Sequence, residues 1–218
     1  MNLTVIITAG GIGKRMNSSI PKQFLTINHK PILMHTIERF YQFDKTAQLL
    51  VTLPSDWWEF WEDLTQEYNF NLPITLVAGG VERYDSIKAA LKHVKGDIVA
   101  VHDGVRPCVS LDTIKQAVQC AKTEQAVVPV LPLKESIRKG TFTTSEATDR
   151  SCYFTVQTPQ CFTKDVLKKA YEQPFTQRIT DDASLVEQTG QKITLIQGNA
   201  ENIKITEPLD LKIASLFL

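Results

Sequence analysis

The chain has 218 residues, a length that suits one large globular domain. Apolar residues make up 43% of it and charged residues 22%, which excludes the disordered, fibrous and disulfide-dense classes. The 24 basic and 24 acidic residues cancel, so bulk charge gives no reason to expect nucleic acid or an anionic membrane as a partner. An anionic ligand must therefore be bound by a local cluster of cations.

Short β-branched runs alternate with stretches of helical periodicity, which predicts an α/β fold with a parallel sheet covered by helices. The expected strands span residues 3–8, 48–53, 74–77, 98–102, 127–131 and 193–196. The expected helices span residues 31–41, 56–68, 85–93, 111–122, 164–171, 181–188 and 208–217. N-cap candidates precede several of them, and a glycine suits the left-handed position after one: Ser55, Ser110, Thr163, Thr180 and Gly190.

One segment, residues 133–154, interrupts this alternation. It is rich in threonine, serine and charge, has a Lys139-Gly140 turn and lacks helical periodicity, so we expect a two-stranded arm that leaves the sheet. Because isolated two-stranded arms are marginally stable in water, the arm is expected to pack on a second subunit and form a homodimer. A surface loop without a partner is the alternative. With no repeat and no low-complexity linker, residues 1–218 are expected to form one domain.

The first expected strand runs into a glycine-rich turn, Ala9-Gly10-Gly11-Ile12-Gly13-Lys14-Arg15-Met16. Such a turn lets backbone N–H groups approach a phosphate, and it lies where open α/β sheets bind ligands. It is not a P-loop, since Arg15 stands where serine or threonine is needed, and Met16 replaces the third glycine of the dinucleotide fingerprint. The sequence therefore predicts another kind of phosphate site, with Lys14, Arg15 and Lys22 as its cations; a solvated basic turn is the alternative.

Two further turns follow expected strands. The Gly79-Gly80 turn is expected to expose main-chain donors and acceptors to the edge of a nucleobase, and Ser86 on the next helix could hydrogen-bond the same base. An ordinary capped turn between a strand and a helix is the alternative. Asp103 ends an apolar strand and is predicted to hold Mg²⁺ or a substrate hydroxyl. Arg106 is expected to pair with a phosphate or with Asp103, and His102 to be packed or hydrogen-bonded rather than a metal ligand.

The four cysteines form no CxxC pair, and no histidine spacing near them suggests zinc. We expect reduced, mostly packed thiols in a cytoplasmic protein. No apolar run approaches the roughly 20 residues of a membrane-spanning helix, and the first residues, MNLTVIITAGG, lack a basic leader. Neither a membrane nor nucleic acid is expected as a partner.

Seven segments, taken together and in this order, resemble the 2-C-methyl-D-erythritol 4-phosphate cytidylyltransferase family of the non-mevalonate isoprenoid pathway: AGGIGKRM, PKQFL, GGVERYDS, HDGVRPC, QTPQCF, ITDDAS and ENIKIT. They span Ala9 to Thr206. The resemblance implies a Rossmann-like, nucleotidyltransferase-type fold, with helices on both faces of a mostly parallel sheet and a projecting β-arm. It also implies a homodimer that joins CTP to this polyol phosphate with Mg²⁺, giving 4-diphosphocytidyl-2-C-methyl-D-erythritol and pyrophosphate.

The resemblance also implies roles for individual residues. The cations Arg15 and Lys22 would bind the CTP phosphates, while Lys204 and Arg150, the latter on the arm and directed towards the partner subunit's site, would hold the polyol phosphate. The implied nucleotide-binding residues are Ala9, Gly10, Gly11, Gly13, Gly80, Arg83 and Ser86. The implied substrate-binding residues are Asp103, Arg106, Ser136 and Thr180, with Asp103 also a metal ligand, directly or through water.

Two positions depart from the family pattern: Val81 stands where aspartate is familiar, and Ser136 where the arm carries threonine. A ribitol-5-phosphate cytidylyltransferase is the nearest alternative, since it shares the glycine-rich loop, PKQF and NIKIT. The TDDAS segment and the Thr-Asp-Arg before QTPQ favour the methylerythritol enzyme. A protein that binds a nucleotide without catalysing a reaction would lack at least one of Arg15, Lys22, Arg150 and Lys204, and all four are present. A nicotinamide dehydrogenase is disfavoured because Met16 replaces the third glycine of the dinucleotide fingerprint.

Overall fold

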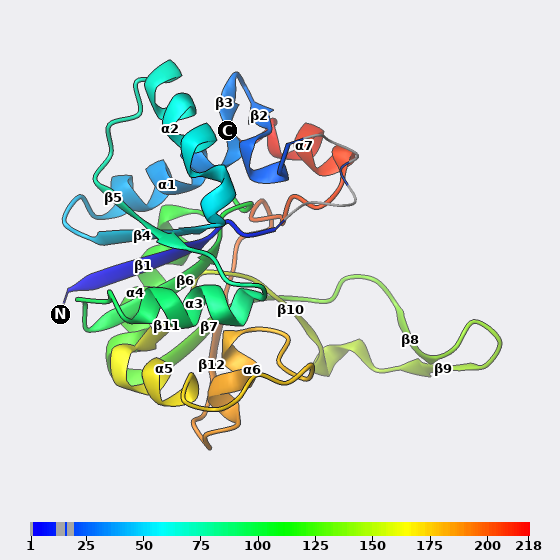
Figure 1. Ribbon diagram of the computed structural model, residues 1–218. Helices are drawn as coiled ribbons and strands as arrows, with labels where there is room; N and C mark the ends of the chain where they lie inside the picture. Colours follow the sequence, from blue (N-terminus) through cyan, green and yellow to red (C-terminus); the bar gives the residue numbers. More distant parts are fainter. Residues whose placement is uncertain (1, 12–15, 17–19) are drawn as a thin grey trace.

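The computed structural model describes residues 2–11, 16 and 20–218. Over these residues the central sheet has eight strands. They are β1 (Leu3–Thr8), β4 (Gln48–Leu53), β5 (Ile74–Ala78), β6 (Ile98–Asp103), β7 (Ala126–Pro132), β10 (Phe154–Val156), β11 (Gln160–Thr163) and β12 (Thr194–Gln197). Their order is β10-β7-β11-β6-β1-β4-β5, with β12 beside β7 (Figure 1).

Most of the sheet is parallel, as predicted. Strands β5, β4, β1 and β6 pair in parallel, and β12 pairs in parallel with β7. Strand β11 is antiparallel to both β6 and β7, and β10 is antiparallel to β7. Strands β10 and β11 were not predicted. β11 is a four-residue QCFT segment with little apolar pattern of its own.

Helices cover both faces of this sheet, which confirms the expected fold class. One face carries α1 (Ile32–Phe43), α2 (Trp58–Glu67) and α4 (Leu111–Glu124); the other carries α3 (Arg83–Leu91), α5 (Lys164–Ala170) and α6 (Asp182–Glu187). Within β1, Val5 and Ile7 pack in the first layer and Ile6 in the second, because successive strand side chains point to opposite faces. Helix α7 (Pro208–Ala214) packs in a third, smaller cluster with Ile32 and Val105.

The helix ends were predicted with mixed success. Ser110 caps α4 by accepting a hydrogen bond from the Thr113 amide at 3.0 Å, and Gly190 has the left-handed φ of 83°. The prediction for Thr180 is wrong, because Asp181 is the N-cap of α6. Ser55 begins a separate 3₁₀ turn, Ser55–Trp57, ahead of α2.

The segment 133–154 contains a separate two-stranded antiparallel sheet, β8 (Ile137–Gly140) with β9 (Ser145–Thr148), which confirms the predicted hairpin. Figure 1 shows it projecting away from the rest of the molecule. A second small hairpin, β2 (Thr26–Ile27) with β3 (Lys30–Pro31), leads into α1. In the described part of the chain, no helix has the length and apolar character needed to cross a membrane.

Candidate functional site

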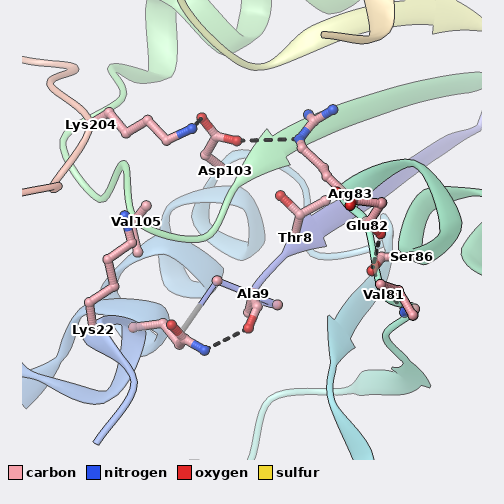
Figure 2. A pocket seen from close by; sticks show the side chains of 14 residues that line it. Thr8, Ala9, Lys22, Val81, Glu82, Arg83, Ser86, Asp103, Val105 and Lys204 are labelled. Atoms are coloured by element: carbon pink, nitrogen blue, oxygen red, sulfur yellow. Dashed lines mark hydrogen bonds and ion pairs between the residues drawn. The ribbon is translucent and has the colours of Figure 1, made fainter. Parts of the chain in front are cut away.

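The carboxyl ends of β1, β5 and β6 meet around a cavity of about 410 Å³. The parallel register sets Thr8 at the end of β1 beside Asp103 at the end of β6, so residues far apart in sequence share one rim. Figure 2 shows the cavity from close by. Its lining consists of Thr8, Ala9, Gly10, Gly11, Lys22, Gln23, Gly80, Val81, Glu82, Arg83, Ser86, Asp103, Val105 and Lys204.

One side of the cavity is built by the turn after β1 and the short 3₁₀ turn Lys22–Phe24. The Gln23 amide donates to the Ala9 carbonyl at 2.6 Å, and Lys22 Nζ donates to the Ile205 carbonyl at 2.9 Å. Phe24 is buried and packs its ring against Phe60 at 5.1 Å between ring centroids. This apolar anchor and the two hydrogen bonds fix the segment that presents Lys22.

The opposite side is the turn between β5 and α3. The Gly80 amide donates to Ser86 Oγ at 3.0 Å, and Ser86 Oγ donates to the Glu82 carbonyl. Glu82 and Asp85 form a capping box that starts α3. A Cβ at Gly80 would lie 2.2 Å from that of Asp85, so the turn requires glycine. Val81, 96% exposed, presents an apolar side chain at the edge of the cavity.

Asp103 is the centre of an ion-pair cluster in the cavity. Its Oδ2 lies 3.1 Å from both Arg106 Nε and Lys204 Nζ, and its Oδ1 lies 3.7 Å from Arg83 Nε. Figure 2 shows the carboxylate between Lys204 and Arg83. Burial alone would raise the pKa of Asp103, but Arg83, Lys204 and Arg106 outweigh it and hold that pKa well below its usual range. Asp103 is therefore an ionised carboxylate surrounded by cations.

Arg83 has a second acidic partner behind the cavity wall. Its Nη2 lies 2.7 Å from Oδ2 of Asp182, whose Oδ1 accepts a hydrogen bond from the Tyr171 hydroxyl at 2.5 Å. Burial alone would lower the pKa of Arg83, but Asp182 and Asp103 outweigh it and raise that pKa. The guanidinium is thus charged and held between two carboxylates.

The turn that carries Asp103 and Arg106 is closed by His102. His102 Nε2 lies 3.0 Å from the Arg106 carbonyl, which can only accept, so Nε2 carries the proton and Nδ1 accepts from the Thr158 hydroxyl at 2.9 Å. Thr158 Oγ1 in turn accepts from the Asp103 amide. Burial lowers the pKa of His102 to about 4, so the ring is neutral. This confirms the prediction of a packed, hydrogen-bonded histidine.

The loop that carries Lys204 is tied to the same turn. Arg106 Nη1 donates to the Asn202 carbonyl at 2.8 Å, and Asn202 Nδ2 donates to the Thr158 carbonyl at 2.8 Å. The Ile205 amide donates to the Val105 carbonyl at 3.0 Å. These bonds place Lys204 over Asp103, although 43% of the Lys204 side chain stays exposed to solvent.

The structure brings most of the predicted site residues to the cavity: Ala9, Gly10, Gly11, Lys22, Gly80, Arg83, Ser86, Asp103 and Lys204. Arg106 reaches it through its ion pair with Asp103. Gly13, Lys14 and Arg15 lie outside the described residues.

Three predicted residues lie elsewhere. Thr180 borders a smaller cavity of about 100 Å³ that shares Glu82 and Arg83 with the main one. Ser136 and Arg150 are exposed on the arm, where the Arg150 guanidinium donates to the Lys134 carbonyl. Within one chain, therefore, neither Ser136 nor Arg150 lines the cavity.

Four lining residues were not predicted as site residues: Thr8, Gln23, Glu82 and Val105. Glu82 had a signal, since an acidic residue three positions before Asp85 is a capping pattern that moves the start of α3 upstream. Gln23 had none, because its role comes from the Ala9 carbonyl fourteen positions away in sequence.

Among the residues that the structure describes, no group of three or more histidine, cysteine, aspartate or glutamate side chains is placed to hold a metal ion. Asp103, the predicted metal ligand, already faces three cationic side chains. A positive ion would be repelled by that surrounding charge. Asp103 with these neighbours does not fit a metal site built by the protein alone.

Comparisons with known proteins all match one family. The family model described as 2-C-methyl-D-erythritol 4-phosphate cytidylyltransferase (IspD) matches residues 3–218. Proteins of that name from Phocaeicola vulgatus and Bacteroides fragilis are 48% and 47% identical to this chain; the first match covers 100% of both chains and the second 99% of each.

Solved structures agree with this match. The 2-C-methyl-D-erythritol 4-phosphate cytidylyltransferase of Francisella tularensis has a TM-score of 0.82 and 30% identity, with 100% of both chains covered. That of Thermus thermophilus has a TM-score of 0.80 and 29% identity, with 99% of this chain and 98% of the other covered. The similarity spans every element that lines the cavity.

Proposed function

Because this chain belongs to the 2-C-methyl-D-erythritol 4-phosphate cytidylyltransferase family, we propose that its cavity transfers the cytidylyl group of CTP to the phosphate of 2-C-methyl-D-erythritol 4-phosphate. The products are 4-diphosphocytidyl-2-C-methyl-D-erythritol, a precursor in isoprenoid biosynthesis, and pyrophosphate. The names of the relatives support this acceptor over ribitol 5-phosphate.

The observation that carries the proposal is the cationic lining beside the glycine turn, formed by Lys22, Arg83 and Lys204. In the reaction, an oxygen of the polyol phosphate forms a bond to the α-phosphorus of CTP. The bond from that phosphorus to the bridging oxygen breaks, and pyrophosphate leaves with the electron pair. Because a phosphate monoester has a second pKa of about 6, it is already nucleophilic at neutral pH and needs no protein base.

The barrier lies in bringing two polyanions together, so positioning and charge neutralisation by the cavity supply the catalysis. Lys22, with Arg15, is assigned to the CTP phosphates beside the Gly10-Gly11 turn. The turn from Gly80 to Ser86 is assigned to the cytosine and ribose, and it supports that role by ending at the edge of the cavity.

Lys204, Asp103 and Arg106 are assigned to the polyol phosphate, with Thr180 at the adjoining small cavity. Asp103 suits a polyol because an ionised carboxylate accepts hydrogen bonds from hydroxyl groups. Lys204 suits the phosphate because it is cationic and partly exposed.

Magnesium enters this proposal with the substrate. Since Asp103 is surrounded by cations, the ion is assigned to the oxygens of the triphosphate rather than to a site on the protein. Bound there, Mg²⁺ would neutralise part of the charge of the phosphates and of the leaving pyrophosphate.

A homodimer completes the proposed site. Arg150 lies on the projecting arm, and the neighbouring segment exposes Tyr153, Phe154 and Val156, each between 45% and 47%. Exposed aromatic and aliphatic side chains on an edge strand support packing against a second subunit, whose cavity Arg150 would enter.

The four cysteines are free thiols, which supports a reducing, cytoplasmic location.

A coupled assay of pyrophosphate release tests the proposal. The protein is given CTP and Mg²⁺ with either 2-C-methyl-D-erythritol 4-phosphate or ribitol 5-phosphate. Release with the first acceptor and at least about tenfold lower kcat/KM with the second is the expected result. Equal or faster release with ribitol 5-phosphate would assign the chain to the alternative reaction.

A further inference from the structure

Asp182 lies directly behind the wall of the cavity and does not line it. Its side chain is fully buried, at the first turn of α6, while Arg83 is at the first turn of α3. The two residues are 99 positions apart in sequence, and their side chains meet at 2.7 Å. An ionised carboxylate in such a place is costly unless it is paired and hydrogen-bonded, and here it is both.

Two carboxylates compete for the same guanidinium. Nη2 of Arg83 faces Asp182 at 2.7 Å, while Nε faces Asp103 at 3.7 Å, so the shorter contact is with the carboxylate outside the cavity. The Tyr171 hydroxyl holds the other oxygen of Asp182 and fixes the orientation of that carboxylate. The direction of the Arg83 side chain is therefore determined by Asp182.

That direction has consequences inside the cavity. With Arg83 held by Asp182, Oδ2 of Asp103 is left to Arg106 and Lys204. Without the charge of Asp182, the guanidinium would be drawn fully to Asp103, where it would compete with Lys204 and change the position of the carboxylate. A displacement of groups that align substrates lowers the rate even when every catalytic group is kept.

We propose that Asp182 is a positioning residue for the transfer reaction: it orients Arg83, and through Arg83 it sets the position of the Asp103 carboxylate and the charge available from Lys204. The kinetic part of this inference rests on the proposed function. The structural part does not, because the position of Arg83 can be observed without turnover.

The variant Asp182→Asn keeps the shape of the side chain and removes its charge. The matched control is Thr4→Val, at the far end of β1, which is also isosteric and removes the hydrogen bonds of the buried Thr4 hydroxyl with Gln48 and Gly96. Crystal structures of both variants come first. The expected result is that the Arg83 guanidinium moves towards Asp103 in D182N and stays in place in T4V; an unmoved Arg83 in D182N would overturn the proposal.

Kinetics then test the consequence. We expect D182N to lower kcat/KM for the polyol phosphate at least about tenfold. T4V should leave kcat/KM within about twofold of wild type, even if it lowers the melting temperature as much as D182N does. In an Arg83→Lys background, which lacks the fork that bridges two carboxylates, D182N should add less than about twofold. Independent, multiplying effects of the two changes would show that Asp182 does not act through Arg83.

These outcomes separate the two proposals. A wild-type chain that releases no pyrophosphate would refute the proposed function, while the crystal structures would still decide whether Asp182 positions Arg83. If D182N does not fold, the Arg83→Lys variant takes its place in the crystallographic test, and its shorter, unforked side chain is expected to contact Asp182 and not Asp103, because Asp182 makes the shorter contact in the wild type. An ammonium group in contact with Asp103 and not with Asp182 in that variant would overturn the proposal.

Discussion

Lys22 and Lys204 lie in different parts of the cavity, and this difference predicts different kinetic roles. Lys22 follows the turn that ends β1 and donates to Ile205, whereas Lys204 pairs with Asp103 at the end of β6. The first position suits the nucleotide phosphates and the second the polyol phosphate.

For Lys22→Ala we expect kcat to fall by about 10²–10³, as when one transition-state donor is lost. The fold should persist, since the hydrogen bond to Ile205 contributes about 1 kcal/mol to stability. Steady-state kinetics with both substrates and a urea titration measure the two effects. Lys30→Ala, which breaks an ion pair with Glu38 outside the cavity, is the control and should behave as wild type. Turnover of K22A within about threefold of wild type would refute the assigned role.

Lys204→Ala should instead raise KM for the polyol phosphate and lower kcat through lost alignment, with the Kd for CTP within about threefold of wild type. Isothermal titration with CTP and initial rates at varied polyol phosphate separate the two quantities. A large loss of CTP affinity would place Lys204 on the nucleotide.

His102 predicts a pH dependence of stability. Its pKa is lowered by burial to about 4 in the folded chain, against 6.5 for an ordinary histidine. Between these values the unfolded chain binds the extra proton, so stability is complete above this range and falls as pH decreases through it. The loss from His102 between about pH 7 and pH 5 is about 2 kcal/mol.

Urea titrations across this pH range measure the effect. We expect His102→Gln, which cannot titrate, to flatten the dependence of unfolding free energy on pH by about that amount. His93→Gln, at an exposed histidine, should keep the wild-type slope. An unchanged slope in H102Q would mean that His102 is not a neutral, buried ring.

The turn between β5 and α3 predicts a steric effect. Gly80→Ala would bring a Cβ to 2.2 Å from that of Asp85, so we expect a destabilisation of about 1–3 kcal/mol and a raised KM for CTP. Gly11→Ala has room, with Lys22 as the neighbour at 3.8 Å, and its stability should be within about 0.5 kcal/mol of wild type. Denaturant midpoints of the two variants decide; equal stability would mean that the turn does not need glycine at position 80.

The central strands were predictable because they are buried on both faces and read as continuous apolar runs. β1 and β4 match the expected bounds, and the predicted β6 lacks only its last residue, Asp103. β11 could not be predicted, since its place comes from pairing with β6 and β7 rather than from its own four residues. The start of α6 shows the same limit: Thr180 and Asp181 are both good caps by type, and the tertiary structure selects Asp181.

Most residues of the site were predicted from the sequence, but most of the contacts that connect them were not. Asp103 and Arg106 are close in sequence, so their pairing was foreseen as one of two outcomes. The contacts from Lys204 to Asp103 and from Asp182 to Arg83 join segments about 100 residues apart, and only the folded sheet brings them together.

The proposed dimer predicts about twice the chain mass of 24.5 kDa in size-exclusion chromatography with light scattering. If Arg150 acts in the partner's cavity, mixing inactive Arg150→Ala with inactive Lys22→Ala should restore activity, because a mixed dimer has one site with both residues intact. Subunit exchange is checked with tagged chains. A monomer at micromolar concentration, or exchange without recovered activity, would contradict this arrangement.

A crystal structure of the protein with CTP and Mg²⁺ would test these assignments together. We expect the cytosine at the turn from Gly80 to Ser86, the triphosphate along Gly10, Gly11 and Lys22, and the metal ion on triphosphate oxygens. The α-phosphorus should face the side of the cavity where Lys204 meets Asp103. A nucleotide bound outside this cavity, or with its α-phosphorus turned away from Lys204, would contradict these assignments.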